Sequence, residues 1–389
     1  MKKLAILGAS YLQRPLVEKA NEMGLETHVF AWEKGNVVDD IADSFYPISV
    51  IEKEDILKKC SCIGIDGVTS IASDIVMPTV NYVAEKLGLV GNSLGTTRIS
   101  TDKFEMRKAL RNADISCPAF YFYQKPDFCN TDSLTFPLIV KPTDRSGSRG
   151  VTKVKNPGEV NAAIKKALDN SINKRVIVEE FIEGREFSVE MISYQGNHHF
   201  LAATDKVTTG APYFVEIEHH QPAEIDSKTE QNIIQTVQYA LDVLKIKNGA
   251  SHSEVLLTPE GEVKIVEIAG RMGGDFIGSD MIPLSTGYDF VKGIIQIALG
   301  EFESINKGEF KKDFSGVYYV LPKPGTIKSI IDRSGEYRSV RKAINILKKG
   351  DKIPEVIDGP GKRAGVIVYS HPGKKIKINP NEVLQFKMS

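Results

Sequence analysis

The sequence predicts an α/β protein that begins with a parallel sheet, and three observations support this prediction. Through about the first hundred residues, short apolar segments alternate with helical segments, as is typical of a parallel sheet covered by helices. The chain has 389 residues, enough for two or three domains of about 150 residues each. Its hydrophobic content of 41% and charged content of 26% are those of a globular protein rather than a disordered one.

The balance of charges indicates which partners to expect. Lys and Arg number 50, as do Asp and Glu, so the formal net charge is zero. Without a global positive field, we expect no nucleic-acid or membrane partner. The apolar run near the N-terminus is too short for a signal peptide, and no run approaches the ~20 apolar residues that span a bilayer. We therefore expect a cytoplasmic protein that acts on small molecules.

The four cysteines lack the spacing of a zinc site. Cys60 and Cys62 are expected to be buried free thiols beside a strand, and Cys117 and Cys129 stand alone. Sparse, unpaired cysteines fit the cytoplasmic prediction.

Each element of the first hundred residues follows from its periodicity. Strands are expected at 4–7, 26–30 and 62–65, and helices at 15–23 and 74–87. Gly8-Ala9-Ser10-Tyr11 follows the first strand and does not match G-x-G-x-x-G. Hydride transfer is therefore disfavoured, although this turn can still approach a ligand.

A new segment begins near Thr101 and mixes strands and helices. Helices are expected at 101–112, 157–168 and 227–244, strands at 136–142, around 176–192 and before Lys206, and a hairpin at 251–269. After about residue 310 we expect short strands, a Lys-rich helix and Gly/Pro turns.

The strand that ends at Lys141 runs into a loop rich in Gly and Ser, residues 144–151. Glycines let backbone N–H groups converge on a phosphate, and a lysine can neutralise its charge. The loop is not a Walker P-loop, and the protein-kinase motifs are absent. The alternative is a mobile hairpin with an incidental lysine.

Five acidic residues occur in the strand-like stretch 179–190. They fit the solvated face of a sheet, or an adenosine site. In the second interpretation, backbone groups near Glu180 and Ile182 pair with the base, and Glu186 accepts hydrogen bonds from ribose hydroxyls.

The hairpin 251–269 places two carboxylates together. If Glu260-Gly261 forms a two-residue turn, Glu254 faces Glu267 and Leu256 faces Ile265. Like charges directly opposite one another are destabilising without compensation, which a divalent cation such as Mg²⁺ bridging to phosphates would provide. The alternatives are an exposed pair or a different register.

Arg271 follows the second carboxylate closely enough to reach a carboxylate or phosphate at the metal. Its alternative is an internal ion pair with Glu267 or Asp275. Lys206 and a polar group further along the chain can also line the cavity, although lone histidines more often satisfy structural hydrogen bonds. That group comprises Glu216, His219 and His220.

In this order, the lysine, the loop, the acidic strand and the paired glutamates with arginine resemble the ATP-grasp superfamily, over about residues 1–300. The tail is similar to the C-terminal part of the biotin-carboxylase-like branch. The resemblance implies an ATP-grasp fold, both α/β and α+β. It has a Rossmann-like pre-ATP-grasp domain at 1–98, an ATP-grasp domain of two lobes around ATP at 99–305, and a small C-terminal mixed β domain at 306–389.

The resemblance also implies roles for individual residues. ATP would be held by two phosphate lysines, a flexible loop, a hinge and a ribose acid: Lys103, Lys141, Ser146, Gly147, Ser148, Gly150, Glu179, Glu180, Phe181, Ile182 and Glu186. Glu254 and Glu267 would hold Mg²⁺ or Mn²⁺. Arg271, which resembles the arginine that holds an acyl phosphate, and Lys206 would be catalytic. Substrate contacts are expected from Glu216, His219, Gly273, Gly274 and Asp275.

One departure from the family pattern concerns the metal. The usual Glu-Ile-Asn-x-Arg reads Glu267-Ile268-Ala269-Gly270-Arg271 here. Alanine cannot coordinate a cation, so a second Mg²⁺ would be absent or held by another group such as Asp275.

Three short segments look most like L-amino-acid ligases and carnosine-synthase-type ligases: residues 208–212, 249–254 and 271–275. This implies an ATP-dependent carboxylate–amine ligase that forms an acyl phosphate on amino-acid substrates and releases ADP and phosphate. The alternatives are a purine-pathway ligase, of the phosphoribosylglycinamide synthetase or aminoimidazole ribonucleotide carboxylase type, and a catalytically silent ATP-binding module. A homodimer is left open.

Overall fold

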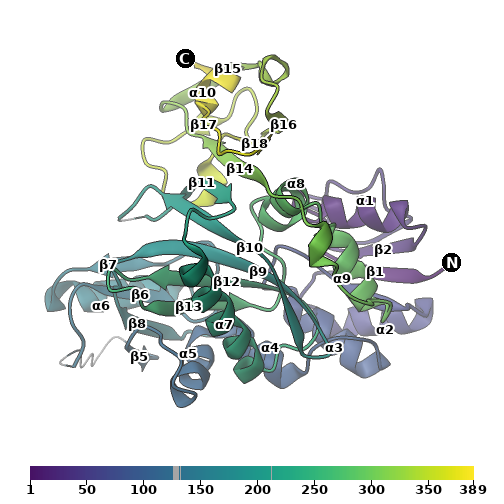
Figure 1. Cartoon of the computed structure of the whole chain (residues 1–389), viewed down its shortest axis with the longest axis horizontal. Helices are drawn as coiled ribbons and strands as arrows, with labels where there is room; N and C mark the ends of the chain where they lie inside the picture. Colours follow the sequence, from purple (N-terminus) through teal and green to yellow (C-terminus); the bar gives the residue numbers. More distant parts are fainter. Residues whose placement is uncertain (126–130, 132, 212) are drawn as a thin grey trace.

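A computed structural model describes residues 1–125, 131, 133–211 and 213–389. The N-terminal part is a parallel sheet in the order β3-β2-β1-β4. Figure 1 shows β1 and β2 of this sheet beside α1, near the N-terminus. Its strands are β1 (Lys3–Leu7), β2 (Glu26–Phe30), β3 (Ser44–Tyr46) and β4 (Gly67–Thr69), and its helices are α1 (Arg14–Glu22), α2 (Lys53–Ile63) and α3 (Met77–Leu87). The predicted α/β start of the chain is confirmed.

The strand predicted at 62–65 is wrong. Helix α2 continues to Ile63 and ends at Gly64, which adopts the left-handed conformation with φ 70°. The apolar positions Ile56 and Cys60 face the core four residues apart, which is a helical spacing. Cys60 is therefore a buried thiol in a helix, whereas Cys62 is exposed. Cys129 lies outside the described residues.

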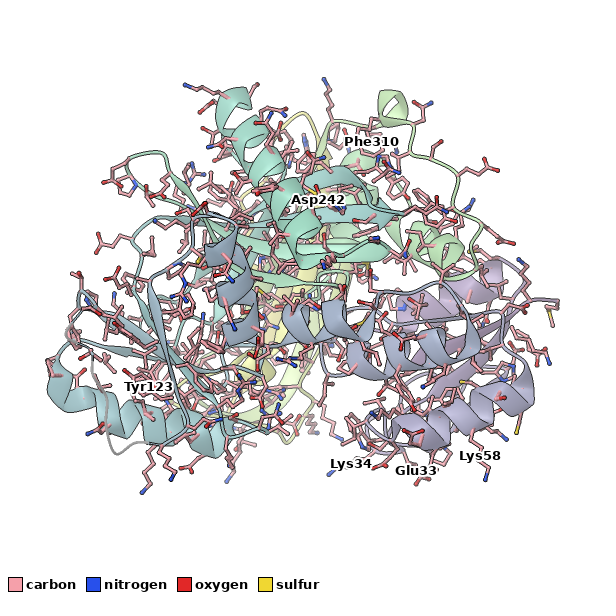
Figure 2. All side chains as sticks on the ribbon, turned by 90° about the horizontal axis from the view of Figure 1, so that it is seen from below. Glu33, Lys34, Lys58, Tyr123, Asp242 and Phe310 are labelled. Atoms are coloured by element: carbon pink, nitrogen blue, oxygen red, sulfur yellow. The ribbon has the colours of Figure 1, made fainter. Side chains whose placement is uncertain are left out.

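A small antiparallel sheet in the order β5-β8-β6-β7 follows. It comprises β5 (Phe120–Tyr123), β6 (Leu138–Pro142), β7 (Thr152–Val154) and β8 (Val176–Glu180), and α6 (Pro157–Asn170) packs against it. The apolar side chains of α6 and of the strands share one core. Helices α4 (Leu94–Thr101) and α5 (Lys103–Asn112) precede this sheet. Figure 2 shows Tyr123 of the small sheet and Lys58 of α2 on opposite sides of the molecule.

The large sheet has the order β13-β12-β9-β10-β11-β14-β18-β16. Its strands are β9 (Arg185–Tyr194), β10 (Asn197–Thr208), β11 (Glu216–Gln221), β12 (Gly249–Leu257), β13 (Val263–Ala269), β14 (Asp313–Val320), β16 (Val340–Asn345) and β18 (Gly365–Pro372). Helix α7 (Ser227–Leu244) packs on one face through an apolar stripe that includes Ile233, Val237 and Leu241. The Lys-rich helix expected in the tail is wrong: among the described residues after 310 the α-helix is the short α10 (Pro380–Val383), which contains no lysine, and the basic segment around Lys342 forms the half-exposed strand β16.

Two groups of elements contact a different one of the three expected domains (1–98, 99–305 and 306–389) from the one that contains them. Helix α9 (Phe290–Ala298) packs against α1 and β4, so its side chains share a core with the N-terminal sheet. Strands β14, β18 and β16 extend the large sheet beyond residue 306. The remaining tail strands, β15 (Gly325–Asp332), β17 (Lys352–Ile353) and β19 (Leu384–Met388), pair with one another beside α10 (Pro380–Val383). In the described part of the chain, no helix is long and apolar enough to cross a membrane.

The β12–β13 hairpin pairs Glu254 with Glu267, as predicted, although the turn differs. The turn is one residue longer than expected, because Thr258 donates its backbone N–H to Glu262 and Gly261 takes φ 84°. A bulge between Glu254 and Val255 then restores the expected pairing beyond it. Leu256 consequently faces Lys264 rather than Ile265, and Ile265 is buried in the core under α7.

Candidate active site

A cavity of about 590 Å³ lies between the small sheet and the large sheet. It is lined by most of the predicted site residues: Lys103, Lys141, Ser146, Gly147, Ser148, Glu179, Glu180, Phe181, Ile182, Glu186, Lys206, Glu216, Glu254, Glu267 and Arg271. Five predicted residues do not line it: Gly150, His219, Gly273, Gly274 and Asp275. The segments that approach the cavity come from both sheets and from the start of α5.

Lys103 is held at the first residue of α5. Asp102 caps this helix, accepting hydrogen bonds from the backbone of Phe104 and Glu105 at 3.0 and 3.1 Å. Lys103 Nζ donates to Glu267 Oε1 at 2.8 Å and to the carbonyl of Arg145 at 2.7 Å. Burial alone would lower the pKa of Lys103, but the Glu267 carboxylate outweighs it and raises that pKa. The lysine therefore stays charged between the loop and the carboxylate pair.

Lys141 is held by a buried ion triad. Its Nζ lies 2.6 Å from Glu179 Oε2, and Arg107 Nε lies 2.6 Å from Glu179 Oε1. Burial would raise the pKa of Glu179, but Arg107 and Lys141 lower it. The Glu179 side chain thus holds Lys141 in place at the cavity. Glu179 was expected only as part of the adenine hinge, so this positioning role was not predicted. Arg107, which is fully buried, was not predicted.

Apolar side chains also line the cavity. Ile139, Phe181, Ile182, Phe214 and Leu256 line it, and the Phe181 and Phe214 rings lie 6.3 Å apart. The Glu180 carboxylate turns away to accept the backbone N–H of Thr135 at 2.8 Å. This wall suits a flat heterocycle, as expected for the hinge.

Gly150 serves the loop by packing rather than by lining the cavity. It has φ 76°, and a Cβ at this position would stand 2.9 Å from Cβ of Asn170 and 3.0 Å from Cγ of Pro142. A side chain would therefore displace the end of the phosphate loop.

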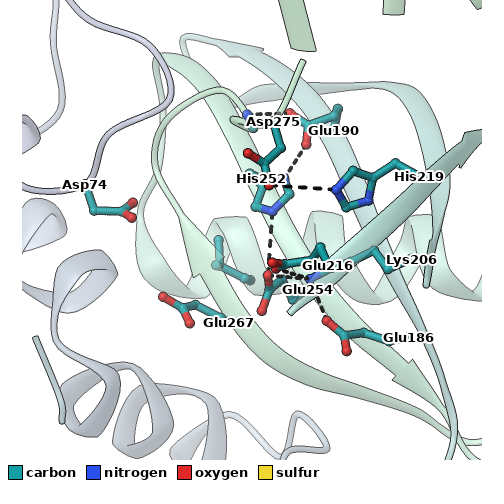
Figure 3. Close-up of polar contacts among 12 residues, drawn as sticks. Asp74, Glu186, Glu190, Lys206, Glu216, His219, His252, Glu254, Glu267 and Asp275 are labelled. Carbon is teal, nitrogen blue, oxygen red and sulfur yellow. Dashed lines mark hydrogen bonds and ion pairs between the residues drawn. The ribbon is translucent and has the colours of Figure 1, made fainter. Parts of the chain in front are cut away.

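The two opposed glutamates are each paired with a lysine. Lys206 Nζ lies 2.7 Å from Glu254 Oε1 and 2.6 Å from Glu186 Oε1, with Glu216 Oε1 at 3.8 Å (Figure 3). Burial would lower the pKa of Lys206, but these three carboxylates hold it well above its ordinary value. Burial likewise opposes the charge on Glu254, yet Lys206 and His252 keep its pKa well below the usual range. The Glu254 carboxylate of this predicted metal pair is therefore ionised.

Behind Glu254 lies a buried pair that was not predicted. His252 Nδ1 is hydrogen-bonded to Glu190, and His252 Nε2 lies 3.8 Å from Glu254 Oε1 (Figure 3). Glu190 also accepts the backbone N–H of Gly273 at 3.0 Å. A Cβ on Gly273 would stand 2.5 Å from Glu190 Oε1. The glycine therefore leaves room for the Glu190–His252 pair and does not contact the cavity. His252 could have been found from the sequence, because it shares a strand face with Glu254 two residues away.

Arg271 does face the cavity, and its partner comes from the N-terminal part of the chain. Its Nε and Nη2 donate to Asp74 Oδ1 and Oδ2 at 2.8 and 3.0 Å. The alternative pairing with Glu267 or Asp275 is therefore not observed. Asp74 lies in the loop before α3, and no sequence motif marked it.

The predicted substrate residues beyond Arg271 form a separate cluster beside the cavity. Asp275 receives two hydrogen bonds from Arg363, at 2.8 and 2.9 Å, and lies 3.9 Å from His219 Nε2. His219 is buried, with its ring edge against Tyr319. His220 pairs with Glu218 and Tyr369 and does not line the cavity. Because Arg363 occupies both oxygens of Asp275, that carboxylate is a poor substitute for the missing metal-ligand asparagine at Ala269.

The donor set fits a divalent cation. Glu254 and Glu267 are directly opposed, and each forms an ion pair here, with Lys206 and Lys103 respectively. Mg²⁺ is commonly bound by one or two carboxylates together with substrate phosphates. Among the described residues, no group of three or more His, Cys, Asp or Glu could hold a metal by itself. The site therefore fits a cation shared with a phosphate ligand.

Comparisons with known proteins show what the chain is similar to. A family model described as an ATP-grasp domain matches residues 134–280. The alanine–anticapsin ligase of Bacillus subtilis is 28% identical over 254 residues, covering 59% of this chain and 52% of that protein. The chain thus spans about half the length of that relative.

Two solved structures share the whole fold. An L-amino acid ligase from Bacillus licheniformis has a TM-score of 0.86 at 24% identity, over 100% of this chain and 99% of that chain. Phosphoribosylglycinamide synthetase from Anaerococcus prevotii has a TM-score of 0.79 at 19% identity, over 100% of both chains. The chain has the ATP-grasp fold, and its residues 134–280 match the ATP-grasp domain model.

Proposed function

We propose that the protein is an ATP-dependent carboxylate–amine ligase that acts on amino acids. The observation that carries the proposal is one cavity in which an opposed carboxylate pair meets lysines from both sheets and an arginine. ATP would transfer its γ-phosphoryl group to a carboxylate oxygen, releasing ADP. The amine of the second substrate would then attack the acyl carbon, and the C–O bond to phosphate would break as phosphate leaves.

The chain's own residues mainly place and neutralise anions. Lys103 and Lys141 offset the charge of the nucleotide phosphates, and the backbone of the loop around Gly147 covers them. Glu186, at the cavity wall beside Lys206, would accept from ribose hydroxyls. Two anions, a carboxylate and a phosphate, would otherwise repel one another, so their positioning is the larger part of the catalysis.

Glu254 and Glu267 would hold Mg²⁺ or Mn²⁺. Lys103 and Lys206 would then pair with nearby phosphate and carboxylate oxygens instead of with these glutamates. When bound, such a cation neutralises phosphate oxygens during phosphoryl transfer. Arg271 would hold the acyl phosphate through the N–H groups that it directs at the cavity.

The substrate class is supported by relatives. The alanine–anticapsin ligase and the L-amino acid ligase are both named for joining amino acids. Glu216 lines the cavity and would contact the amino-acid substrates, whereas the other predicted substrate residues, His219, Gly273, Gly274 and Asp275, do not line it and would act on the substrates only through their neighbours. Thr208 of the segment that resembles these ligases lines the cavity, whereas Pro212 lies outside the described residues. The division into domains 1–98, 99–305 and 306–389, a homodimer and a cytoplasmic location remain predictions.

The test is a phosphate-release screen with ATP, Mg²⁺ and every pair of amino acids, with products identified by mass spectrometry. We expect ADP, phosphate and a dipeptide-like product from at least one pair. Turnover only with a phosphoribosyl compound would replace the amino-acid proposal with a purine-pathway ligase. ATP that binds and stays intact under all conditions would indicate a silent nucleotide-binding module.

A further inference from the structure

We propose that Asp74, in the loop before α3, is a positioning residue that aims Arg271 into the nucleotide cavity. The inference rests on the proposed function, in which Arg271 holds the acyl phosphate. Asp74 comes from the N-terminal part of the chain, whereas Arg271 follows β13 of the large sheet. The pair therefore ties the geometry of the reacting centre to a segment 197 residues away.

The hydrogen bonds of Arg271 divide its guanidinium into a held side and a free side. A guanidinium has five N–H bonds in a fixed plane. Nε and Nη2 each give one to Asp74, and Nη1 gives one to the carbonyl of Met272 at 3.2 Å. Two N–H bonds remain, one on each terminal nitrogen, with no acceptor among the described residues. Two donors in one plane suit two oxygens of a phosphate or carboxylate.

The loop that carries Asp74 also contacts the segment that carries Arg271. The backbone N–H of Ala72 donates to the carbonyl of Met272 at 3.2 Å, and Ala72 lies against Gly274. The two loops are thus joined by a backbone contact as well as by the ion pair. A free arginine side chain samples many rotamers, and the two hydrogen bonds to Asp74 restrict that freedom before a ligand arrives.

The other carboxylates near Arg271 already have partners of their own. Lys103 occupies Glu267 at 2.8 Å, and Arg363 occupies Asp275 at 2.8 Å. Glu190 is committed to His252 and Gly273. Without Asp74, Arg271 would be free to reorient toward any of these carboxylates when their own partners move, which is why we assign the role to Asp74.

The alternative is an ordinary ion pair that only joins two loops, and the chain offers a matched control. Asp40 likewise receives two hydrogen bonds from one arginine, from Nη1 and Nη2 of Arg14 at 2.9 Å each, on the surface of the N-terminal part. We expect Asp74→Asn to lower kcat at least tenfold while KM for ATP stays within about twofold. Asp74→Glu should recover part of the loss, and Asp40→Asn should change neither constant. Asp74→Asn with kcat within twofold of wild type would overturn the inference.

A binding measurement separates this inference from the proposed function. Acetyl phosphate, with ADP present, is titrated by calorimetry into the wild type, Asp74→Asn and Arg271→Gln. If Asp74 acted only through its charge, its removal would strengthen binding of this anion. The positioning role predicts the opposite, a loss of at least fivefold, with no further loss when Asp74→Asn is added to Arg271→Gln.

The two sets of results remain distinguishable. A wild type that binds acetyl phosphate through Arg271 and Asp74 but joins no substrates would reject the ligase proposal and retain the positioning role. Normal ligation with unchanged or tighter acetyl phosphate binding in Asp74→Asn would reject the positioning role alone. A wild type that does not bind acetyl phosphate would also overturn it.

Discussion

The His252–Glu190 pair makes folding stability depend on pH in a defined direction. Burial alone would lower the pKa of His252, but the carboxylates of Glu190 and Glu254 raise it from 6.5 to about 9. The folded chain thus binds this proton more tightly than the unfolded chain. The difference corresponds to about 3 kcal/mol of unfolding free energy. This stabilisation is fully present below pH 6.5 and is lost as the pH rises through about 9.

The assay is urea unfolding of the wild type and His252→Gln in EDTA, at several values from about pH 6 to about pH 10. We expect the stability gap between them to be about 3 kcal/mol larger at the acidic end. His28→Gln is a control of opposite sense, because burial lowers the pKa of His28, so protonation at low pH opposes folding of the wild type. A His252 gap that is constant, or that grows with pH, would refute the reasoning.

Three further predictions concern single side chains. Glu267→Gln should abolish ADP formation with an unchanged circular dichroism spectrum, because one of the two opposed carboxylates is lost; normal turnover would remove the metal assignment. Gly273→Ala should lower stability by about 1–3 kcal/mol, since its Cβ would stand 2.8 Å from His252 Nδ1; an unchanged Tm in calorimetry would contradict the close approach. Arg363→Met should cost about 3 kcal/mol in urea unfolding because Asp275 loses both hydrogen bonds, and a loss below about 1 kcal/mol would count against it.

Local patterns predicted the elements whose hydrophobic spacing is regular. Helix α7 begins and ends where its apolar period does, because Asp226 caps one end and Lys245 takes the left-handed conformation at the other. The Glu254–Glu267 pairing was also predicted, although the assumed turn was one residue too short and a bulge compensated for it. Turns and bulges depend on single residues, so register is predicted less securely than the existence of a hairpin.

The parts of the site that were missed depend on contacts between distant segments. Asp74, Arg107 and Glu190 bind partners that lie 62 or more residues away along the chain. No spacing rule reaches such pairs, and each of these residues alone resembles a surface charge. For Asp275 the prediction went too far. Its closeness to Arg271 in the sequence suggested a place at the cavity, but in the structure it binds Arg363 from the C-terminal part instead.

The central claim is that a carboxylate is activated by phosphorylation in the cavity between the two sheets. The most direct measurement uses an amino acid with ¹⁸O in its carboxylate, together with ATP, Mg²⁺ and the amine identified in the screen. The account predicts that one ¹⁸O atom appears in the released phosphate, and that Glu267→Gln releases none. Phosphate free of ¹⁸O, formed alongside a genuine amide product, would contradict the acyl-phosphate mechanism.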